Sequence, residues 1–170
     1  MIQKCSLMRV AGIFFKEPTS IHFIKEIGKK IKLAPTSVRK HIQELKKEGI
    51  IIEKKAFPFS GFVANLENDK FLFYKRAFNL FSIYELKDFI VNTLAPSAII
   101  LFGSYSRGED TENSDLDILI IRKTKKEVIL DNFEKSLSRK IHLTSVSSIE
   151  DLEKNIKENV KRGILLYGTY

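Results

Sequence analysis

Residues 101–121 read LFGSYSRGEDTENSDLDILII, and this stretch decides the fold of the second half of the chain. An apolar strand ends in Gly103-Ser104, and after ten intervening residues Asp115 and Asp117 open a second apolar strand. Because side chains alternate along a strand, this spacing predicts both carboxylates on one face. Two like charges this close repel each other unless a cation neutralises them, and Mg²⁺ prefers such hard oxygen ligands. The stretch therefore predicts that Asp115 and Asp117 bind a divalent metal, Mg²⁺ or Mn²⁺.

The residues that follow the first strand are suited to an anionic ligand. Gly103 lets the backbone approach a ligand closely, and Ser104 supplies a hydroxyl group. Arg107 adds a cation, and backbone N–H groups at such a turn can hold phosphate oxygens. We expect Gly103, Ser104 and Arg107 to bind phosphate groups.

The remaining residues of the second half fit an α/β domain introduced by Ala95-Pro96. Short apolar runs bounded by turn residues predict strands, and longer amphipathic runs predict helices. The predicted strands are 98–102, 115–121, 140–146 and 163–167, and the predicted helices are 126–137 and 149–159.

The order strand, Gly103-Ser104, ten residues, Asp115-x-Asp117, strand resembles the DNA polymerase β-type nucleotidyltransferase superfamily over about residues 95–170. The Ser-Arg-Gly and Ser-Asp-Leu-Asp sequences are most similar to its small branch, the minimal nucleotidyltransferases. The resemblance implies that the two aspartates hold two Mg²⁺ ions that carry a nucleoside triphosphate, ATP in the first place. Gly103 and Ser104 would hold the β- and γ-phosphates. An acceptor oxygen would attack the α-phosphate in line, with pyrophosphate leaving.

The same resemblance implies partners for the chain. Minimal nucleotidyltransferases often act with a separately encoded helical protein as toxin–antitoxin pairs, and some adenylylate that partner. A helical toxin-type partner and a homodimer are therefore among the expected assemblies.

One residue departs from the pattern of the superfamily, whose members usually have a third carboxylate on a later strand. Here that strand reads RKIHLT over residues 139–144, and His142 stands where the carboxylate is expected. Histidine can ligate a metal or accept a proton, but it is a poorer ligand than a carboxylate for Mg²⁺. Either His142 is a catalytic substitute, or it is an ordinary strand histidine beside a weakened site.

Residues 1–67 predict a winged helix-turn-helix domain. Apolar residues recur with helical spacing over 4–15 and 21–31, and Thr19 or Ser20 is expected to cap the second helix. A third helix is expected from Pro35 to a stop at Gly49, with a hairpin over residues 50–66.

The chain as a whole is expected to be α/β (α+β), because an N-terminal winged helix precedes a C-terminal nucleotidyltransferase domain that has a mixed sheet flanked by helices. Residues 68–94 alternate aromatic and charged side chains at helical spacing, which predicts a helical linker. The expected domains are 1–67, 68–94 and 95–170.

The net charge of +8 is uneven along the chain. Residues 1–92 contain 17 Lys and Arg against 9 Asp and Glu, whereas residues 93–170 contain 12 of each, so a polyanionic partner is expected for the first half only. The run PTSVRKHIQELKKEGII, which starts at Pro35, is similar to the recognition helices of archaeal and bacterial winged-helix regulators. This resemblance extends over residues 5–67. The alternative is a winged helix that docks a protein, with its charge simply solvated. Binding to DNA is expected from the exposed side chains of this helix and from the wing, namely Thr36, Ser37, Arg39, Lys40, Gln43, Lys54 and Lys55.

The composition excludes several classes of protein. A single cysteine, Cys5, excludes an internal disulfide and a cysteine zinc site, and 44% hydrophobic residues exclude a disordered chain. No apolar run approaches 18 residues and no signal-peptide pattern is found, so no membrane association and a cytoplasmic location are expected.

Two functions from different classes follow from the sequence. The first is an enzyme that transfers a nucleotidyl group, AMP among the candidates, to an acceptor. The second is a DNA-binding regulator whose nucleotidyltransferase-like domain is catalytically weak or senses a nucleotide. The Gly-Ser and Asp-x-Asp motifs favour the first, and His142 in the carboxylate position favours the second.

Overall fold

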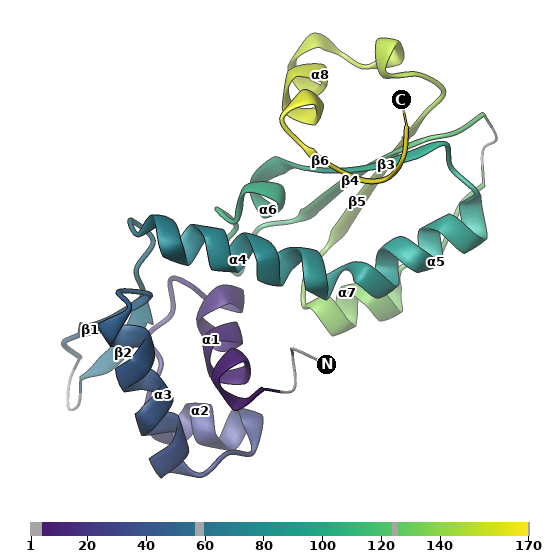
Figure 1. Ribbon diagram of the computed structural model, residues 1–170. Helices are drawn as coiled ribbons and strands as arrows, with labels where there is room; N and C mark the ends of the chain where they lie inside the picture. Colours follow the sequence, from purple (N-terminus) through teal and green to yellow (C-terminus); the bar gives the residue numbers. More distant parts are fainter. Residues whose placement is uncertain (1–4, 57–59, 124–125, 170) are drawn as a thin grey trace. The chain divides into compact units, whose positions relative to one another are not determined.

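The computed structural model describes residues 5–56, 60–123 and 126–169 (Figure 1). These residues form two compact units, an N-terminal unit, Met1–Phe78, and a C-terminal unit, Asn79–Tyr170. The division falls inside one helix, α4 (Asp69–Ser82).

The N-terminal unit consists of three helices, a two-stranded hairpin and the first part of α4. The strands of the hairpin are antiparallel, with Ile51 opposite Ala64 and Lys54 opposite Gly61. This order confirms the predicted winged helix. Its elements are α1 (Ser6–Lys16), α2 (Ile24–Ile31), α3 (Pro35–Lys47), β1 (Ile51–Lys54) and β2 (Gly61–Ala64).

Helix α3 forms where its sequence predicts a helix. Pro35 occupies the first turn, where its missing N–H costs no hydrogen bond. Val38, Ile42 and Leu45 recur at i, i+4 and i+7 and are buried. Gly49 follows the helix with a φ of +73°, a conformation that L side chains rarely adopt.

Helix α2 begins later than predicted, since its N-cap is Phe23 and neither Thr19 nor Ser20. The backbone of His22 explains the delay. It exchanges two hydrogen bonds with Phe62 of β2, at 2.8 and 2.9 Å, and so forms a bridge to the hairpin. A residue committed to a sheet bridge cannot start a helix.

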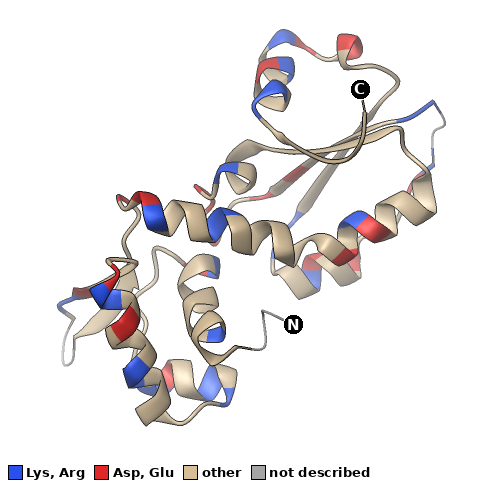
Figure 2. Cartoon of the chain, viewed as in Figure 1, with Lys and Arg blue, Asp and Glu red and all other residues tan. Residues whose placement is uncertain are grey.

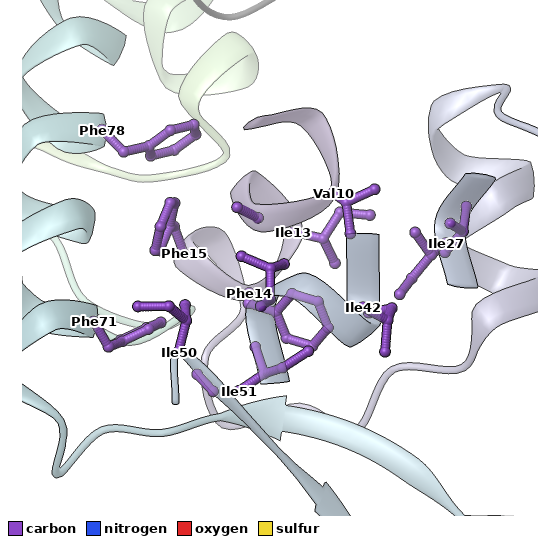
Figure 3. Close-up of a cluster of buried hydrophobic side chains, with 14 residues drawn as sticks. Val10, Ile13, Phe14, Phe15, Ile27, Ile42, Ile50, Ile51, Phe71 and Phe78 are labelled. Carbon is purple, nitrogen blue, oxygen red and sulfur yellow. The ribbon is translucent and has the colours of Figure 1, made fainter. Parts of the chain in front are cut away.

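The core of the N-terminal unit is built around phenylalanines (Figure 3). The Phe15 ring lies 5.5 Å from Phe71 and 5.3 Å from Phe78, measured between centroids. Both partners are on α4, so the first part of this helix belongs to the winged-helix core. Lys75, on the same helix, is fully buried and donates to the Phe15 carbonyl oxygen. Other core residues are Val10, Ile13, Phe14, Ile27, Ile42, Ile50 and Ile51.

The C-terminal unit contains a mixed four-stranded sheet in the order β5-β4-β3-β6. β3 pairs antiparallel with both β4 and β6, and β4 pairs parallel with β5. This arrangement confirms the predicted fold class. The strands are β3 (Ala98–Phe102), β4 (Leu116–Ile121), β5 (Ile141–Val146) and β6 (Ile164–Gly168), and the helices are α5 (Tyr84–Leu94), α6 (Gly103–Arg107), α7 (Asp131–Leu137) and α8 (Lys154–Lys161).

Helices cover both faces of this sheet (Figure 1). Ile99 and Leu101 of β3 pack in the cluster that includes α5 and α7, whereas Ala98 and Ile100 pack with Val160 of α8. A strand buried on both faces reads as a continuous apolar run, which explains the sequences AIILF and LDILII.

Several predicted boundaries differ from the structure. Residues 68–94 are helical, but they divide their apolar side chains between two cores: Phe71 packs in the N-terminal unit, and Leu86 and Ile90 pack in the C-terminal unit. In the C-terminal unit, the helix predicted at 126–137 begins only at Asp131. The helix predicted at 149–159 is instead a 3₁₀ turn, Ile149–Asp151, which begins with a capping box between Ser148 and Asp151 and is followed by α8. Among the described residues, no helix is both long and apolar enough to cross a membrane.

Candidate functional site

Strand register brings the end of β3, Asp117 and His142 together at one end of the sheet of the C-terminal unit. Phe102, the last residue of β3, lies opposite Asp117 of β4. On the other side of β4, Asp117 lies beside His142 of β5. The segment that follows β3 therefore comes close to the Asp-x-Asp motif. His142, which occupies the position of the expected third carboxylate, lies beside Asp117 of the same motif.

Gly103 places the turn directly against a carboxylate. It has a φ of +72°, and a Cβ atom built there would lie 2.3 Å from Oδ2 of Asp117. Any larger residue would be strained and would push the carboxylate away. The glycine of the Gly-Ser motif thus has a specific partner in the Asp-x-Asp motif.

Asp115, Asp117 and His142 form the charged centre of the site. Asp115 lies just before β4, and its Oδ2 is 3.4 Å from Nε2 of His142. The side chains of His142 and Asp115 are 61% and 42% exposed, so a ligand in solvent can reach both. Burial raises the pKa of Asp117, with His142 lowering it and the charge of Asp115 raising it further. The site therefore favours a bound proton or cation.

The two predicted phosphate-binding side chains lie on α6, the five-residue helix after β3. Ser104 is half-buried in its first turn. Arg107 is exposed, and its Nε donates to Oε2 of Glu109 at 2.7 Å. Ser104 therefore stays a predicted phosphate ligand, whereas Arg107 is already paired with a neighbouring carboxylate.

The two aspartates offer hard oxygen ligands of the kind that a divalent cation binds. In the described part of the chain, no group of three His, Cys, Asp or Glu residues is arranged to hold a metal ion. Mg²⁺ usually takes only one or two protein carboxylates and completes its shell with water and substrate phosphates. Asp115 and Asp117 supply such a pair of carboxylates, and burial raises the pKa of Asp117.

Beside this site lies a buried polar cluster that the sequence analysis missed, formed by Asn79, Asp110 and Arg139. The three residues are 2%, 0% and 9% exposed. Any two of these residues are at least 29 positions apart in the sequence, and no sequence pattern links them. A buried Asp in a polar loop could be found only from the three-dimensional contacts.

The predicted DNA-binding residues lie on the N-terminal unit, which holds 16 Lys and Arg against 7 Asp and Glu. Lys and Arg are spread over α2, α3 and the hairpin (Figure 2). Among the described residues, no carboxylate is paired with Arg39 or Lys40, whereas Lys46 is paired with Glu53. Thr36, Arg39, Lys40 and Gln43 of α3 and Lys54 and Lys55 of the wing are exposed, and Ser37 is half-buried.

Comparison with known proteins agrees with this division. Residues 84–169 match the family described as polymerase beta, nucleotidyltransferase, and residues 24–52 match the family described as winged helix-turn-helix DNA-binding. A protein of Methanocaldococcus jannaschii named "Putative protein adenylyltransferase" is 38% identical to this chain over 72 residues. The match covers 41% of this chain and 72% of that protein. Both resemblances predicted from the sequence are thereby confirmed.

Proposed function

Because this chain belongs to the polymerase beta nucleotidyltransferase family, we propose that it transfers AMP from metal-bound ATP to an acceptor. The observation that supports this best is the contact between the two motifs, in which Gly103 leaves space for the Asp117 carboxylate. Asp115 lies just before the strand that carries Asp117. Phosphate-binding and metal-binding groups are therefore adjacent, as transfer from a triphosphate requires.

Each residue has a defined part in this proposal. Asp115 and Asp117 would hold a divalent cation, which would supply positive charge for the triphosphate oxygens. The Ser104 hydroxyl and the backbone at Gly103 hold the β- and γ-phosphates. The acceptor oxygen forms a bond to the α-phosphorus, the bond to the α–β bridging oxygen breaks, and the acceptor hydroxyl loses its proton. In this proposal His142 accepts that proton, and its exposed position beside Asp115 supports the assignment.

The acceptor we propose is a hydroxyl group of a protein. The name of the M. jannaschii relative supports both parts of this proposal, AMP as the transferred group and protein as the acceptor. A helical toxin-type partner is the first candidate.

For the N-terminal unit, a winged-helix domain of the DNA-binding type, we propose contact with duplex DNA through α3. Arg39 and Lys40 support this role, because both are exposed and neither is paired with a carboxylate among the residues that the structure describes. A second function, a DNA-binding regulator with a weak or sensory nucleotidyltransferase domain, is favoured by one observation. His142 stands beside Asp117 where a third carboxylate would complete the metal site.

Labelled substrates test the proposed transfer. The full chain is incubated with Mg²⁺ or Mn²⁺, with each of the four nucleoside triphosphates labelled at the α-phosphate, and with the protein encoded beside it. We expect label from ATP to appear on the protein partner, and no label with the Asp115→Asn/Asp117→Asn variant. Nucleotide binding without label on any acceptor would favour the sensory function instead.

Loss of the Ser104 hydroxyl is expected to weaken triphosphate binding. Ser104→Ala should cost about 1–3 kcal/mol of binding free energy, the scale of a lost hydrogen bond to a charged group. Calorimetry with Mg²⁺ and a non-hydrolysable ATP analogue measures the change. Ser136→Ala, on α7 of the same unit, is the matched control and should leave affinity unchanged. Equal ATP affinity of the wild type and Ser104→Ala would contradict the proposed phosphate contact.

Restoring a carboxylate at position 142 is expected to strengthen the site. His142→Asp should raise Mg²⁺ affinity in the presence of the ATP analogue by about 10-fold, the scale of changes around a metal's ligand set. His142→Asn, similar in size but uncharged, should show no such gain. If Asp and Asn at this position give the same affinity, position 142 does not face the metal.

A further inference from the structure

The buried polar cluster next to the site is centred on an ion pair. Nη2 of Arg139, just before β5, lies 2.7 Å from Oδ2 of Asp110, and the two side chains are 5% and 0% exposed. The other carboxylate oxygen of Asp110 accepts a hydrogen bond from Nδ2 of Asn79 at 2.7 Å. Asn79 also donates to the Tyr105 carbonyl oxygen at 3.0 Å, which ties the pair to α6.

The same arginine holds both ends of a turn. Its Nη1 donates to the Thr111 carbonyl oxygen and, at 3.0 Å, to the Ser114 carbonyl oxygen. Within the turn, Ser114 N donates to Thr111 O at 3.1 Å, and Thr111 N donates to Ser114 Oγ at 2.9 Å. The next residue is Asp115. A single guanidinium therefore fixes the backbone immediately before the first metal-binding carboxylate.

The cluster is also connected to the two other segments that carry site residues, α6 and the start of β5. The Arg139 guanidinium lies 5.5 Å from the ring centroid of Tyr105, the buried residue that follows Ser104 in α6. On the β5 side, Leu116 N donates to Lys140 O at 2.9 Å, so the residue after Asp115 is bound to the residue after Arg139. The Arg139 side chain thus contacts α6 and the turn before Asp115, and Arg139 itself belongs to the segment that leads into β5.

Stability alone does not account for this arrangement. Burying an ion pair costs desolvation energy, and apolar side chains of similar volume often stabilise a protein equally well. The planar fork of an arginine, in contrast, can bond a carboxylate and two carbonyl oxygens in one fixed geometry. The arrangement is suited to holding a turn in place.

We propose that Arg139, paired with Asp110, is a positioning residue that fixes the turn Thr111–Ser114 and thereby places Asp115 beside Asp117 for cation binding. The link to cation binding rests on the proposed function. The position of the turn does not depend on it and can be measured separately.

Arg139→Lys separates charge from geometry, because lysine keeps a cation for Asp110 but lacks the fork. Amide hydrogen exchange of the full chain without nucleotide is expected to rise at least ~10-fold for residues 109–115 and to stay unchanged for residues 118–121. Mn²⁺ affinity in the presence of the ATP analogue, followed by electron paramagnetic resonance, is expected to fall about 10-fold. Arg122→Lys is the matched control, since Arg122 also donates to a backbone carbonyl in this unit, and it should change neither reading.

Each outcome has a defined consequence. Unchanged exchange at 109–115 in folded Arg139→Lys would overturn the proposal, and faster exchange with unchanged Mn²⁺ affinity would overturn the link to Asp115. If Arg139→Lys does not fold, the same exchange measurement on Asp110→Leu/Arg139→Met, which removes both charges, decides the question. A wild-type protein that binds no Mn²⁺ with the analogue would reject the proposed function, while exchange would still decide whether Arg139 fixes the turn.

Discussion

Replacing Asp115 and Asp117 together by asparagine is expected to reduce Mg²⁺-dependent ATP affinity by more than ~100-fold, beyond the 10–100-fold typical of residues outside the ligand set. Asparagine keeps the size and one oxygen of each side chain but removes the charge that holds the cation. Transfer of label should fall below detection for the same reason. Calorimetry with Mg²⁺ and the ATP analogue gives the affinity, and unchanged binding in the double variant would reject the metal assignment.

The same variant is expected to remain folded, which separates loss of function from loss of structure. Burial and the charge of Asp115 raise the pKa of Asp117 above that of an unfolded chain, despite the opposing effect of His142. Stability from such a carboxyl group is present below its unfolded pKa and is lost as the pH rises through its folded pKa. Asp117→Asn, alone or together with Asp115→Asn, should therefore melt at the same or a slightly higher temperature than the wild type near pH 7.

That advantage should disappear when the pH falls to about 3, where the wild-type carboxyl is protonated as well. Thermal melts at both pH values check the sign. Asp131→Asn, at the exposed start of α7, is the control for removing a carboxylate far from this pair. A lower melting temperature of Asp117→Asn near pH 7 would show that its carboxylate stabilises the fold through a partner not identified at this site.

The sequence was sufficient for the elements whose signal is local. β3 is a run of apolar residues between Pro96 and Gly103, and its observed bounds, Ala98–Phe102, are the predicted ones. Helix α3 carries its own start signal, Pro35, and a clear apolar period. Short elements were not predicted because they lack such signals. Helix α6, for example, spans five residues, too few to show a helical period.

The candidate site required information that is not local. The spacing of Asp115 and Asp117 predicted a shared face, but Asp115 lies outside β4, after a turn held by Arg139. The register of β4 against β5 is what brings His142 beside the aspartates. Strand register depends on pairing between segments far apart in sequence, so a motif can identify the residues of a site without giving their arrangement.

Removal of two cations from α3 is expected to weaken DNA binding and to change how the binding constant depends on salt concentration. For duplex DNA, log K falls with log salt with a slope near −0.9 for each phosphate that is neutralised. If Arg39 and Lys40 each contact one phosphate, Arg39→Ala/Lys40→Ala should make the slope shallower by about 1.8. If one of them contacts a base edge instead, the slope should change by about half as much and sequence preference should relax.

Mobility-shift titrations of the full chain with random and upstream-promoter duplexes, over a range of salt concentrations, give both the slope and the preference. Lys154→Ala/Arg162→Ala removes one lysine and one arginine from exposed positions on and next to α8 of the C-terminal unit and should leave both unchanged. Val38 and Ile42 are unsuitable for this test, because they are buried in the core and their loss would unfold the domain. Folded wild-type protein that binds no duplex even at low salt would exclude a DNA role. The winged helix would then be a docking surface for protein, and the excess of cations on the N-terminal unit would serve only solvation.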